Sequence, residues 1–248
     1  MFGSVDAAAE GLRAQGYFVG REVATQVYLA GRLGKPLLVQ GPPGSGRAGL
    51  ARAVAAATGR PLTVLTCHEG ITPGEAAGEL ERSAEVASDG SPMVLVRDVD
   101  AAPAQFQVWL AGMVAVGSGA TTWFLTAAGG DGLHPDLLRS AIAISLSFPV
   151  FEAEVEILLH GVPGISRALA AEVANFAGRL RQQPLRRLPG VAETLDWARA
   201  LVALGAHRLT PAIVDQTAGC LLKDARDLDT FHGARMAALL GGRIDRSG

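Results

Sequence analysis

The sequence predicts an α/β protein in which a five-stranded parallel sheet with helices on both faces is followed by an all-helical domain. Three observations favour this fold class. Short apolar runs alternate with helix-periodic segments as far as Phe148, a glycine-rich turn joins the first apolar run to a helix, and helical periodicity alone remains after Pro149. Strands that alternate with helices are typical of parallel sheets, because each crossover connection carries a helix across the sheet.

The five predicted strands are short apolar runs, several of them rich in β-branched residues. A parallel strand that is covered on both faces gives a continuous apolar run rather than an alternating one. In chain order, the predicted strands are 35–41, 61–66, 92–100, 121–127 and 141–148.

Two helices are predicted between these strands. Residues 47–59 place the apolar residues Leu50, Ala51, Val54 and Ala55 on one face of a helix that ends at Gly59. Glycine commonly closes a helix because it adopts the left-handed conformation without steric cost. Residues 104–117 form the second predicted helix.

The pattern changes at residues 149–151, which we interpret as a domain boundary. Four helical segments follow, at 150–161, 166–181, 191–205 and 211–225. We therefore expect an α/β domain at 1–149, a helical domain at 150–240 and a loose tail at 241–248. The opening residues MFGSV also read as a loose terminus.

Composition excludes several classes of protein. The chain has 248 residues, 49% of them hydrophobic, and a net charge of −2, which gives no electrostatic attraction to nucleic acid or to an anionic membrane. Two cysteines and five scattered histidines predict neither a disulfide framework nor a metal site. No apolar run reaches the ~18 residues of a membrane-spanning helix, and no signal peptide is evident. We expect a cytoplasmic protein.

The stretch GPPGSGRA at 41–48 has the glycine spacing of a phosphate-binding loop. Its place between a strand and a helix predicts backbone amides that point into the turn and a helix dipole that attracts anions. The alternative is a glycine-rich turn that binds no ligand. The residues of this loop that we expect to bind a nucleotide are Gly41, Pro42, Pro43, Gly44, Ser45, Gly46, Arg47, Ala48 and Gly49.

Two positions of the loop depart from the phosphate-loop pattern. Arg47 stands in place of a lysine and keeps the positive charge, but its planar guanidinium is bulkier than an ammonium group. Ala48 stands in place of a serine or threonine, whose hydroxyl would hold Mg²⁺. One magnesium ligand is therefore missing.

The ends of the third and fourth strands depart from the pattern as well. Nucleotide hydrolases follow four apolar residues with Asp-Glu, whereas here Met93–Val96 precede Arg97 and Asp98. Arg97 thus takes the magnesium-binding position and Asp98 takes the position that activates water. The fourth strand ends in Thr-Ala-Ala, with Ala128 at the position where related ATPases carry an asparagine that helps to place that water. Together these changes predict that Mg²⁺-dependent hydrolysis is lost.

The chain resembles AAA+ ATPases of the MoxR family, and most of all the branch associated with carbon-monoxide-dehydrogenase maturation. The resemblance covers roughly residues 15–230. The segments that carry it are GYFVGREVATQVYLAGRLGKPLLVQGPPGSG, LTCHEGITPGEAAGEL, VLVRDVDAAPAQFQVWL, VPGISRALA, LPGVAETLDWARAL and LLKDARDL. It implies a P-loop NTPase (AAA+) core with a five-stranded parallel sheet, an all-α lid domain, and ATP or ADP as the ligand.

The resemblance also assigns roles to residues outside the loop. Tyr17 and Val19 either frame the adenine or pack before the first helix. Arg199 either reaches the phosphates as a sensor or pairs with Glu193 or Asp196. The family carries two arginines that act on the nucleotide of a neighbouring subunit. Here HPDLLRSAIAIS holds Arg139 alone, which puts the arginine finger in doubt.

The family's partners and its insertions bear on function. Its members form hexameric rings, work with other AAA+ subunits and act with proteins that carry a von Willebrand factor A domain. The segments between Thr66 and Met93 and at 112–122 are short, whereas family members usually carry insertions there that line a central pore or contact substrate. The remodelling activity of the family is therefore in doubt here.

Three functions follow as alternatives. The first is an assembly or regulatory subunit, similar to a chaperone, that binds ATP or ADP weakly or without Mg²⁺; in it the Arg97 guanidinium takes the place of the metal. The second is a slow ATPase in which Asp98 is the catalytic carboxylate. The third is a scaffold without nucleotide, in which Arg47 or Arg97 pairs with Asp98 or Asp100.

Cys67 and His68 are interpreted as a buried cysteine beside a loop histidine rather than as a nucleophile and its base.

Overall fold

A computed structural model of the chain describes residues 1–86, 92–116 and 121–241. The chain forms two compact units. One comprises Met1–Pro42 and Gly46–Ser147, and the other comprises Phe148–Gly248 together with Pro43–Ser45. The tail predicted at 241–248 lies outside the described residues from 242 onward. Residues 87–91 and 117–120 also lie outside them; they belong to the two segments, between Thr66 and Met93 and at 112–122, that are short compared with the MoxR family.

The first unit is built on a five-stranded sheet of parallel strands, as predicted. The strand order is β2-β3-β4-β1-β5, so that β1 lies between β4 and β5. The strands are β1 (Leu37–Gln40), β2 (Leu62–Thr66), β3 (Met93–Arg97), β4 (Thr122–Ala127) and β5 (Ile142–Ser145). Each lies within a run predicted from the sequence.

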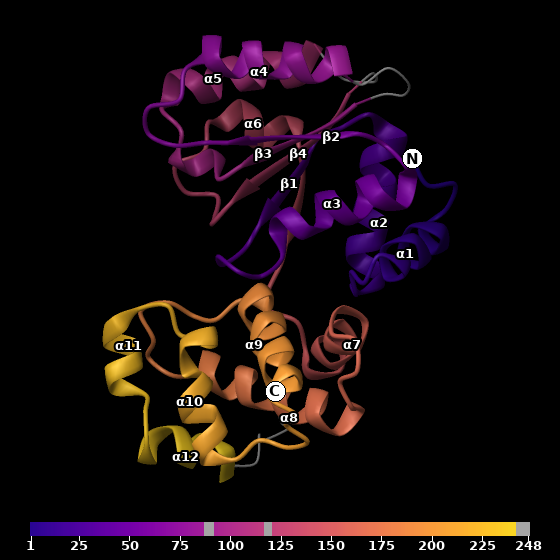
Figure 1. Cartoon of the computed structure of the whole chain (residues 1–248). Helices are drawn as coiled ribbons and strands as arrows, with labels where there is room; N and C mark the ends of the chain where they lie inside the picture. The colour runs from indigo at the N-terminus through magenta and orange to yellow at the C-terminus, as the bar shows by residue number, and fades with distance from the viewer. Residues whose placement is uncertain (87–91, 117–120, 242–248) are drawn as a thin grey trace. The chain divides into compact units, whose positions relative to one another are not determined.

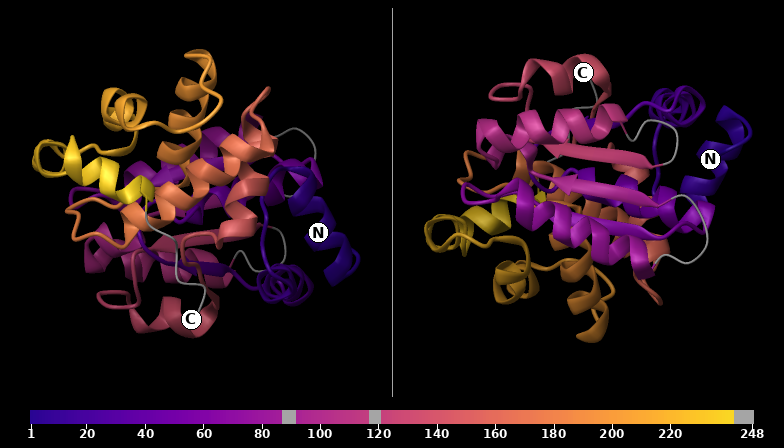
Figure 2. Two further views of the ribbon diagram at one scale, coloured as in Figure 1. Left: turned by 90° about the horizontal axis from the view of Figure 1, so that it is seen from below. Right: turned by 90° about the horizontal axis from the view of Figure 1, so that it is seen from above.

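Helices cover both faces of this sheet, as Figure 1 and Figure 2 show. Side chains of β1 alternate between the faces: Leu38 packs with α4 and α5, whereas Leu37 and Val39 pack with α1, α2 and α3. The helices of this unit are α1 (Val5–Ala14), α2 (Arg21–Leu33), α3 (Arg47–Thr58), α4 (Pro73–Val86), α5 (Ala104–Val116) and α6 (Pro135–Ser140), with a 3₁₀ turn, η1, at Val99–Ala101. The two helices predicted here, α3 and α5, are confirmed.

The prediction of a loose N-terminus is wrong. Ser4 caps α1 by accepting a hydrogen bond from the amide of Ala7 at 3.0 Å. Phe2 packs against the sheet-face cluster and lies so close to Gly11 that a Cβ there would come within 2.7 Å of its ring. The five-residue stretch was misread because its one large apolar residue finds its partners only in the tertiary fold.

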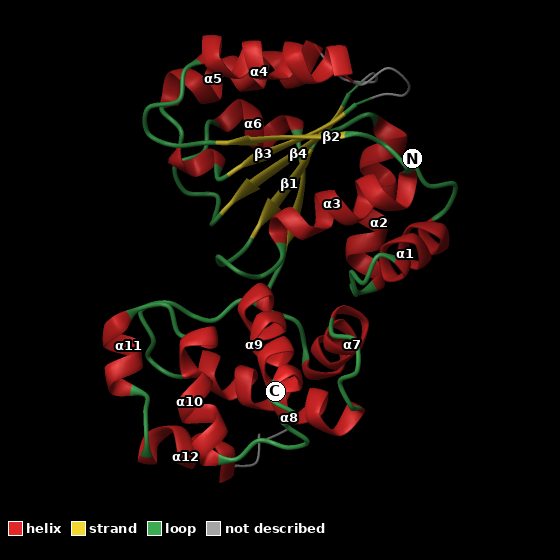
Figure 3. Cartoon of the chain, viewed as in Figure 1, coloured by secondary structure: helices red, strands yellow, loops and turns green. Residues whose placement is uncertain are grey.

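The second unit is entirely helical within its described residues (Figure 3). Its helices are α7 (Phe151–Gly161), α8 (Arg167–Arg181), α9 (Val191–Ala203), α10 (Pro211–Leu221), α11 (Ala225–Thr230) and α12 (Ala234–Gly241). The helix predicted at 211–225 ends four residues early. Asp224 caps α11 instead, and its carboxylate accepts from the amides of Arg226 and Asp227.

The core of the helical unit packs around the buried side chain of Trp197. The Trp197 ring lies 5.3 Å from that of Phe176, centroid to centroid, and its indole nitrogen donates to Thr217 Oγ1 at 2.7 Å. Thr217 in turn donates to the carbonyl of Ile213. This chain of hydrogen bonds satisfies the polar atoms that the core encloses.

A buried ion pair joins α7 to α8. Arg181 donates to both carboxylate oxygens of Glu154 at 2.7 Å, and both side chains are at most 6% exposed. The same guanidinium also donates to Thr194 Oγ1 and to the carbonyl of Pro189, which precedes α9. One side chain therefore ties three helices together. No helix among the described residues is long and apolar enough to cross a membrane.

We expect Glu154→Ala to destabilise the helical unit by about 3 to 5 kcal/mol, because it leaves Arg181 buried without a counter-charge. Glu156→Ala removes an exposed ion pair with Arg167 and should cost less than about 1 kcal/mol. Urea denaturation of the full chain, followed by circular dichroism, measures both. Equal losses for the two variants would contradict the assigned role of the buried pair.

Candidate functional site

Three strands of the sheet end at the same edge of the first unit. The pairing of Gln40 with Ala127 and of Val96 with Leu125 places the carboxyl ends of β1, β3 and β4 side by side. The glycine-rich loop follows β1, and Asp98 follows β3. In open parallel sheets, ligands bind at this edge, because the loops after the strands meet there.

The backbone of the glycine-rich loop has a conformation that requires its glycines. Gly41, Gly44 and Gly46 have φ angles of 152°, 87° and 96°, all in the region that residues with a Cβ rarely adopt. Gly46 is the N-cap of α3, and its carbonyl accepts from the amide of Leu50 at 3.2 Å. The first amides of α3 have no partner within the helix and can therefore bind an anion.

Tyr17 contacts the end of the loop and the start of α3. Its hydroxyl donates to the carbonyl of Gly46 at 3.1 Å, and a Cβ on Gly49 would lie 3.2 Å from its ring. Burial raises the pKa of Tyr17 far above its usual value, so the hydroxyl remains a donor. Val19 packs against the core cluster on the same face of the sheet. The structure shows packing contacts for both Tyr17 and Val19. A contact of either residue with adenine stays a prediction.

Arg47 is the central charged residue of the site. Its side chain is 10% exposed, and Nη2 lies 3.3 Å from Asp98 Oδ1. Two buried polar atoms of the loop, Arg47 Nη1 and Ser45 Oγ, have no hydrogen-bond partner among the described residues. Buried donors rarely stay unpaired. An acceptor oxygen of an anion such as a phosphate would give the Arg47 nitrogen the partner that it lacks.

Both the backbone and the carboxylate of Asp98 make contacts that fix its position. It is the one non-glycine residue with a positive φ, 55°, in the part of the chain that the structure describes. Its amide donates to Thr126 Oγ1 at 3.0 Å, which fixes it to β4. Arg97 Nη2 lies 3.9 Å from its second oxygen, so the carboxylate faces two guanidinium groups.

The next carboxylate along the chain has a structural role. Asp100 Oδ2 accepts from the amide of Ala128 at 2.8 Å and so joins η1 to the end of β4. Sequence reasoning missed this contact and the bond from Asp98 to Thr126, because both join segments about 28 residues apart. The signal that the sequence offered for these contacts was the position of Asp98 and Asp100 just after the third predicted strand.

The described residues offer few groups that could hold a metal ion. No three His, Cys, Asp or Glu side chains cluster within them. Position 48 carries a methyl group, and the carboxylate of Asp98 is engaged by arginine. The chain itself therefore offers few oxygen ligands for Mg²⁺ at this place.

Arg139 and Arg199 lie in ion pairs of their own. Arg139 is 82% exposed on α6 and lies 3.8 Å from Asp136. Arg199, on α9, donates to Asp196 Oδ1 at 2.9 Å and to the carbonyl of Gly161 at 3.2 Å. Pairing of Arg199 with Asp196 was one of the alternatives that the sequence left open.

Cys67 has the properties of a buried structural cysteine. It is 5% exposed, and burial, with the nearby charges of Asp98 and Asp100, raises its pKa to about 12. The thiol is therefore protonated at neutral pH and a poor nucleophile. His68 Nδ1 accepts from the amide of Gly70, so this ring shapes a turn.

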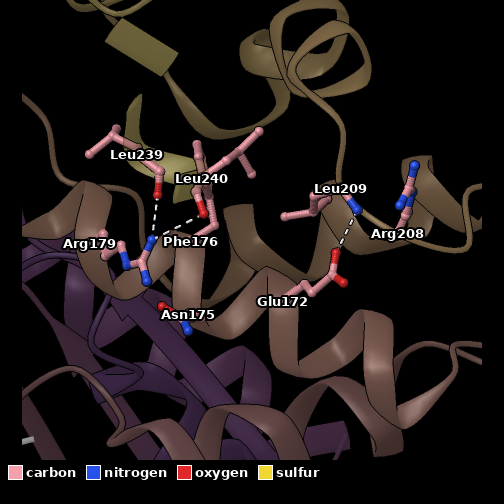
Figure 4. A pocket seen from close by; sticks show the side chains of 8 residues that line it. All are labelled: Glu172, Asn175, Phe176, Arg179, Arg208, Leu209, Leu239 and Leu240. Carbon is pink, nitrogen blue, oxygen red and sulfur yellow. Dashed lines mark hydrogen bonds between the residues drawn. The ribbon is translucent and has the colours of Figure 1, made fainter. Parts of the chain in front are cut away.

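The helical unit contains a separate cavity of about 310 Å³. Figure 4 shows that Arg179 donates to the carbonyls of Leu239 and Leu240 at the end of α12 and that Glu172 accepts from the amide of Leu209. Asn175 Oδ1 and Arg179 Nε, which also line the cavity, are buried without a partner among the described residues. Sequence reasoning did not find it, because its walls come from α8, the segment before α10, and α12. Arg179 here caps a helix end, so this cavity lacks the convergent donors of the glycine-rich loop.

Comparisons with known proteins agree with this architecture. Residues 36–114 match the family model of the AAA domain, dynein-related subfamily. No curated protein sequence matches the chain.

Two solved structures of Thermotoga maritima RuvB are similar to the chain. A RuvB mutant has 19% sequence identity and a TM-score of 0.61, with 86% of this chain and 73% of that chain covered. The RuvB Holliday junction branch migration motor has 20% identity and a TM-score of 0.57, with 84% and 69% covered. At this identity the likeness concerns the fold. The chain thus has a P-loop AAA+ fold, with a five-stranded parallel sheet followed by helices.

Proposed function

We propose that this chain is a MoxR-like AAA+ protein that binds ATP or ADP weakly or without Mg²⁺ and acts as a regulatory or assembly subunit rather than as an efficient ATPase. The observation that carries the proposal is the buried guanidinium of Arg47, whose Nη1 has no partner among the described residues. Arg47 directly follows a glycine-rich loop in which Gly41, Gly44 and Gly46 have positive φ angles and Gly46 is the N-cap of α3, which supports an anion site there.

Binding of a phosphate group follows from the chemistry of these donors. A phosphate oxygen bound to Arg47 Nη1 forms a charge-assisted hydrogen bond, which is stronger than a neutral one. The hydroxyl of Ser45 and the first amides of α3 provide further donors. A site of this kind needs no metal ion to neutralise the phosphate.

Efficient hydrolysis is not expected from the residues at the strand ends. Ala48 has no hydroxyl for Mg²⁺, and the Asp98 carboxylate faces Arg47 and Arg97. A carboxylate that is engaged by two guanidinium groups is a poor base for an attacking water. We propose that Arg97 instead supplies positive charge where the metal would lie.

The ion pair between Arg47 and Asp98 favours a second candidate, a scaffold that binds no nucleotide. In that case Asp98 is the permanent partner of Arg47, and their ion pair, 3.3 Å from Nη2 to Oδ1, takes the place of a bound phosphate. The unpartnered Nη1 of Arg47 favours the first candidate, because a phosphate oxygen at this nitrogen would remove the free-energy cost of a buried unpaired donor beside the loop.

Partners are proposed from the resemblance to the MoxR family. We propose assembly with other AAA+ subunits, in a hexameric ring, and an interaction with a protein that carries a von Willebrand factor A domain. Arg139 is exposed on α6 and so could face a neighbouring subunit. Mass measurement of the assembly with and without nucleotide tests the ring.

We predict that ADP and ATP bind the full chain with affinities that differ by less than about twofold between excess Mg²⁺ and EDTA. Arg47→Ala should weaken binding at least about tenfold, since charge-assisted hydrogen bonds are worth about 1.5 to 3 kcal/mol. Calorimetric titration measures both. Arg52→Ala, an exposed change on the same helix, is the matched control and should have little effect. Tight binding that requires Mg²⁺ would contradict the proposal, and no binding at all would favour the scaffold.

We predict no phosphate release from ATP above the background rate, because the metal ligands and a free catalytic carboxylate are missing. A coupled phosphate assay with the full chain measures this. Release that is abolished by Asp98→Asn would support the slow ATPase instead.

We predict that Tyr17→Phe weakens ADP binding about two- to tenfold, because it removes a hydrogen bond worth about 0.5 to 1.5 kcal/mol from the carbonyl of Gly46. Tyr28→Phe changes the other tyrosine of the chain and serves as the control. An effect of equal size in both variants would show that the loop does not depend on this contact.

A further inference from the structure

The guanidinium of Arg47 faces an acid on one side and has an unpaired donor on the other. Nη2 lies 3.3 Å from Asp98 Oδ1, whereas Nη1 is buried without a partner in the described part of the chain. A guanidinium whose side chain is only 10% exposed has lost most of its solvation by water, so it needs a counter-charge and hydrogen-bond acceptors within the protein or from a ligand. Any anion that enters the loop therefore meets a guanidinium already paired with Asp98.

We propose that Asp98 is a built-in competitor of the nucleotide phosphate: its carboxylate holds Arg47 in the free protein and yields it to the phosphate on binding. This inference rests on the proposed function and adds a regulatory residue to the same site. Asp98 acts on nucleotide through Arg47 and is a positioning residue.

Electrostatic repulsion makes the two anions exclusive. A carboxylate and a phosphate around one buried guanidinium repel each other, and two like charges in one small site are strongly disfavoured. Binding of phosphate therefore costs part of the pair between Arg47 and Asp98. The affinity of the natural chain is lower than the loop alone would provide.

Arg97 can pair with the Asp98 carboxylate after a phosphate has displaced it from Arg47. Arg97 Nη2 lies 3.9 Å from Asp98 Oδ2, and the Arg97 side chain is 40% exposed, so it can follow the carboxylate toward solvent. The backbone of Asp98 stays fixed, because its amide donates to Thr126 Oγ1. The exchange therefore needs a rotation of the side chain and no movement of the strand end.

The backbone conformation of Asp98 also decides which variants test the proposal. With φ at 55° and ψ at 50°, position 98 suits asparagine and glycine, which adopt this left-handed conformation readily. Asp98→Asn removes the charge at nearly constant shape. Asp98→Gly removes the side chain entirely, so agreement between the two variants separates charge from shape.

The experiment is calorimetric titration of ADP in EDTA into the full chain and its variants. Asp98→Asn and Asp98→Gly should each bind ADP about five- to tenfold more tightly than the natural chain. Asp100→Asn removes the same charge two residues away, at a carboxylate that pairs with an amide rather than with arginine. It should change the affinity by less than about twofold, and thermal unfolding of each variant checks that it is folded.

A double-mutant cycle tests whether the effect passes through Arg47. In the Arg47→Ala background, Asp98→Asn should give a gain at least about twofold smaller than in the natural chain, because only the direct repulsion between carboxylate and phosphate remains to be removed. A gain of unchanged size would overturn the proposal, because general charge removal would explain it.

The remaining outcomes separate this inference from the proposed function. Unchanged or weaker ADP binding by both Asp98 variants, with a natural chain that binds ADP, would overturn the competitor and leave the proposed function standing. Binding by the variants but not by the natural chain would support the competitor and overturn the proposed function. Absence of binding in all variants would overturn both.

Discussion

Parallel pairing of β1 with β4 and of β4 with β3 is the constraint on which the site depends. It brings three strand ends to one edge of the sheet, so that Arg47, Asp98 and the end of β4 meet although they are far apart in the sequence. Both faces of the sheet are covered by helices, which leaves its edges as the place for polar chemistry. The loop glycines Gly41, Gly44 and Gly46, all with positive φ angles, follow β1 at this edge.

The charges at this edge form one group. Arg47 is buried and must have an anion, and Asp98 provides one in the free protein. Arg97 stands where a magnesium ligand is expected and lies against the same carboxylate. The replacements in the loop and at the end of β3 are thus electrostatically coupled, because Arg47 and Arg97 both lie next to the carboxylate of Asp98. On the proposal above, a nucleotide phosphate would enter this group by exchange with Asp98.

The helical unit shows the same need to pair buried charge. Glu154 and Arg181 are almost fully enclosed, and Arg181 extends its bonds to Thr194 and Pro189. Arg179 meets the carbonyls at the end of α12. In this unit, arginine joins helices, whereas in the first unit a buried arginine with an unpaired donor lies beside a glycine-rich loop. Arg179 Nε is also unpaired among the described residues, so the glycine-rich loop beside Arg47, and not an unpaired nitrogen alone, distinguishes the two arginines.

Local patterns in the sequence determined the five strands, α3, α5 and the main helices of the second unit, because burial periodicity and glycine punctuation are encoded within each segment. They also identified the loop and the altered residues Arg47, Ala48, Arg97 and Asp98. They could not show that Phe2 packs on the core, that Asp224 starts a new helix, or that Thr126 and Asp100 fix the strand ends. Most of these contacts join residues distant along the chain. The tertiary structure alone decided which acid pairs with Arg47, because that choice depends on the register between strands and on burial.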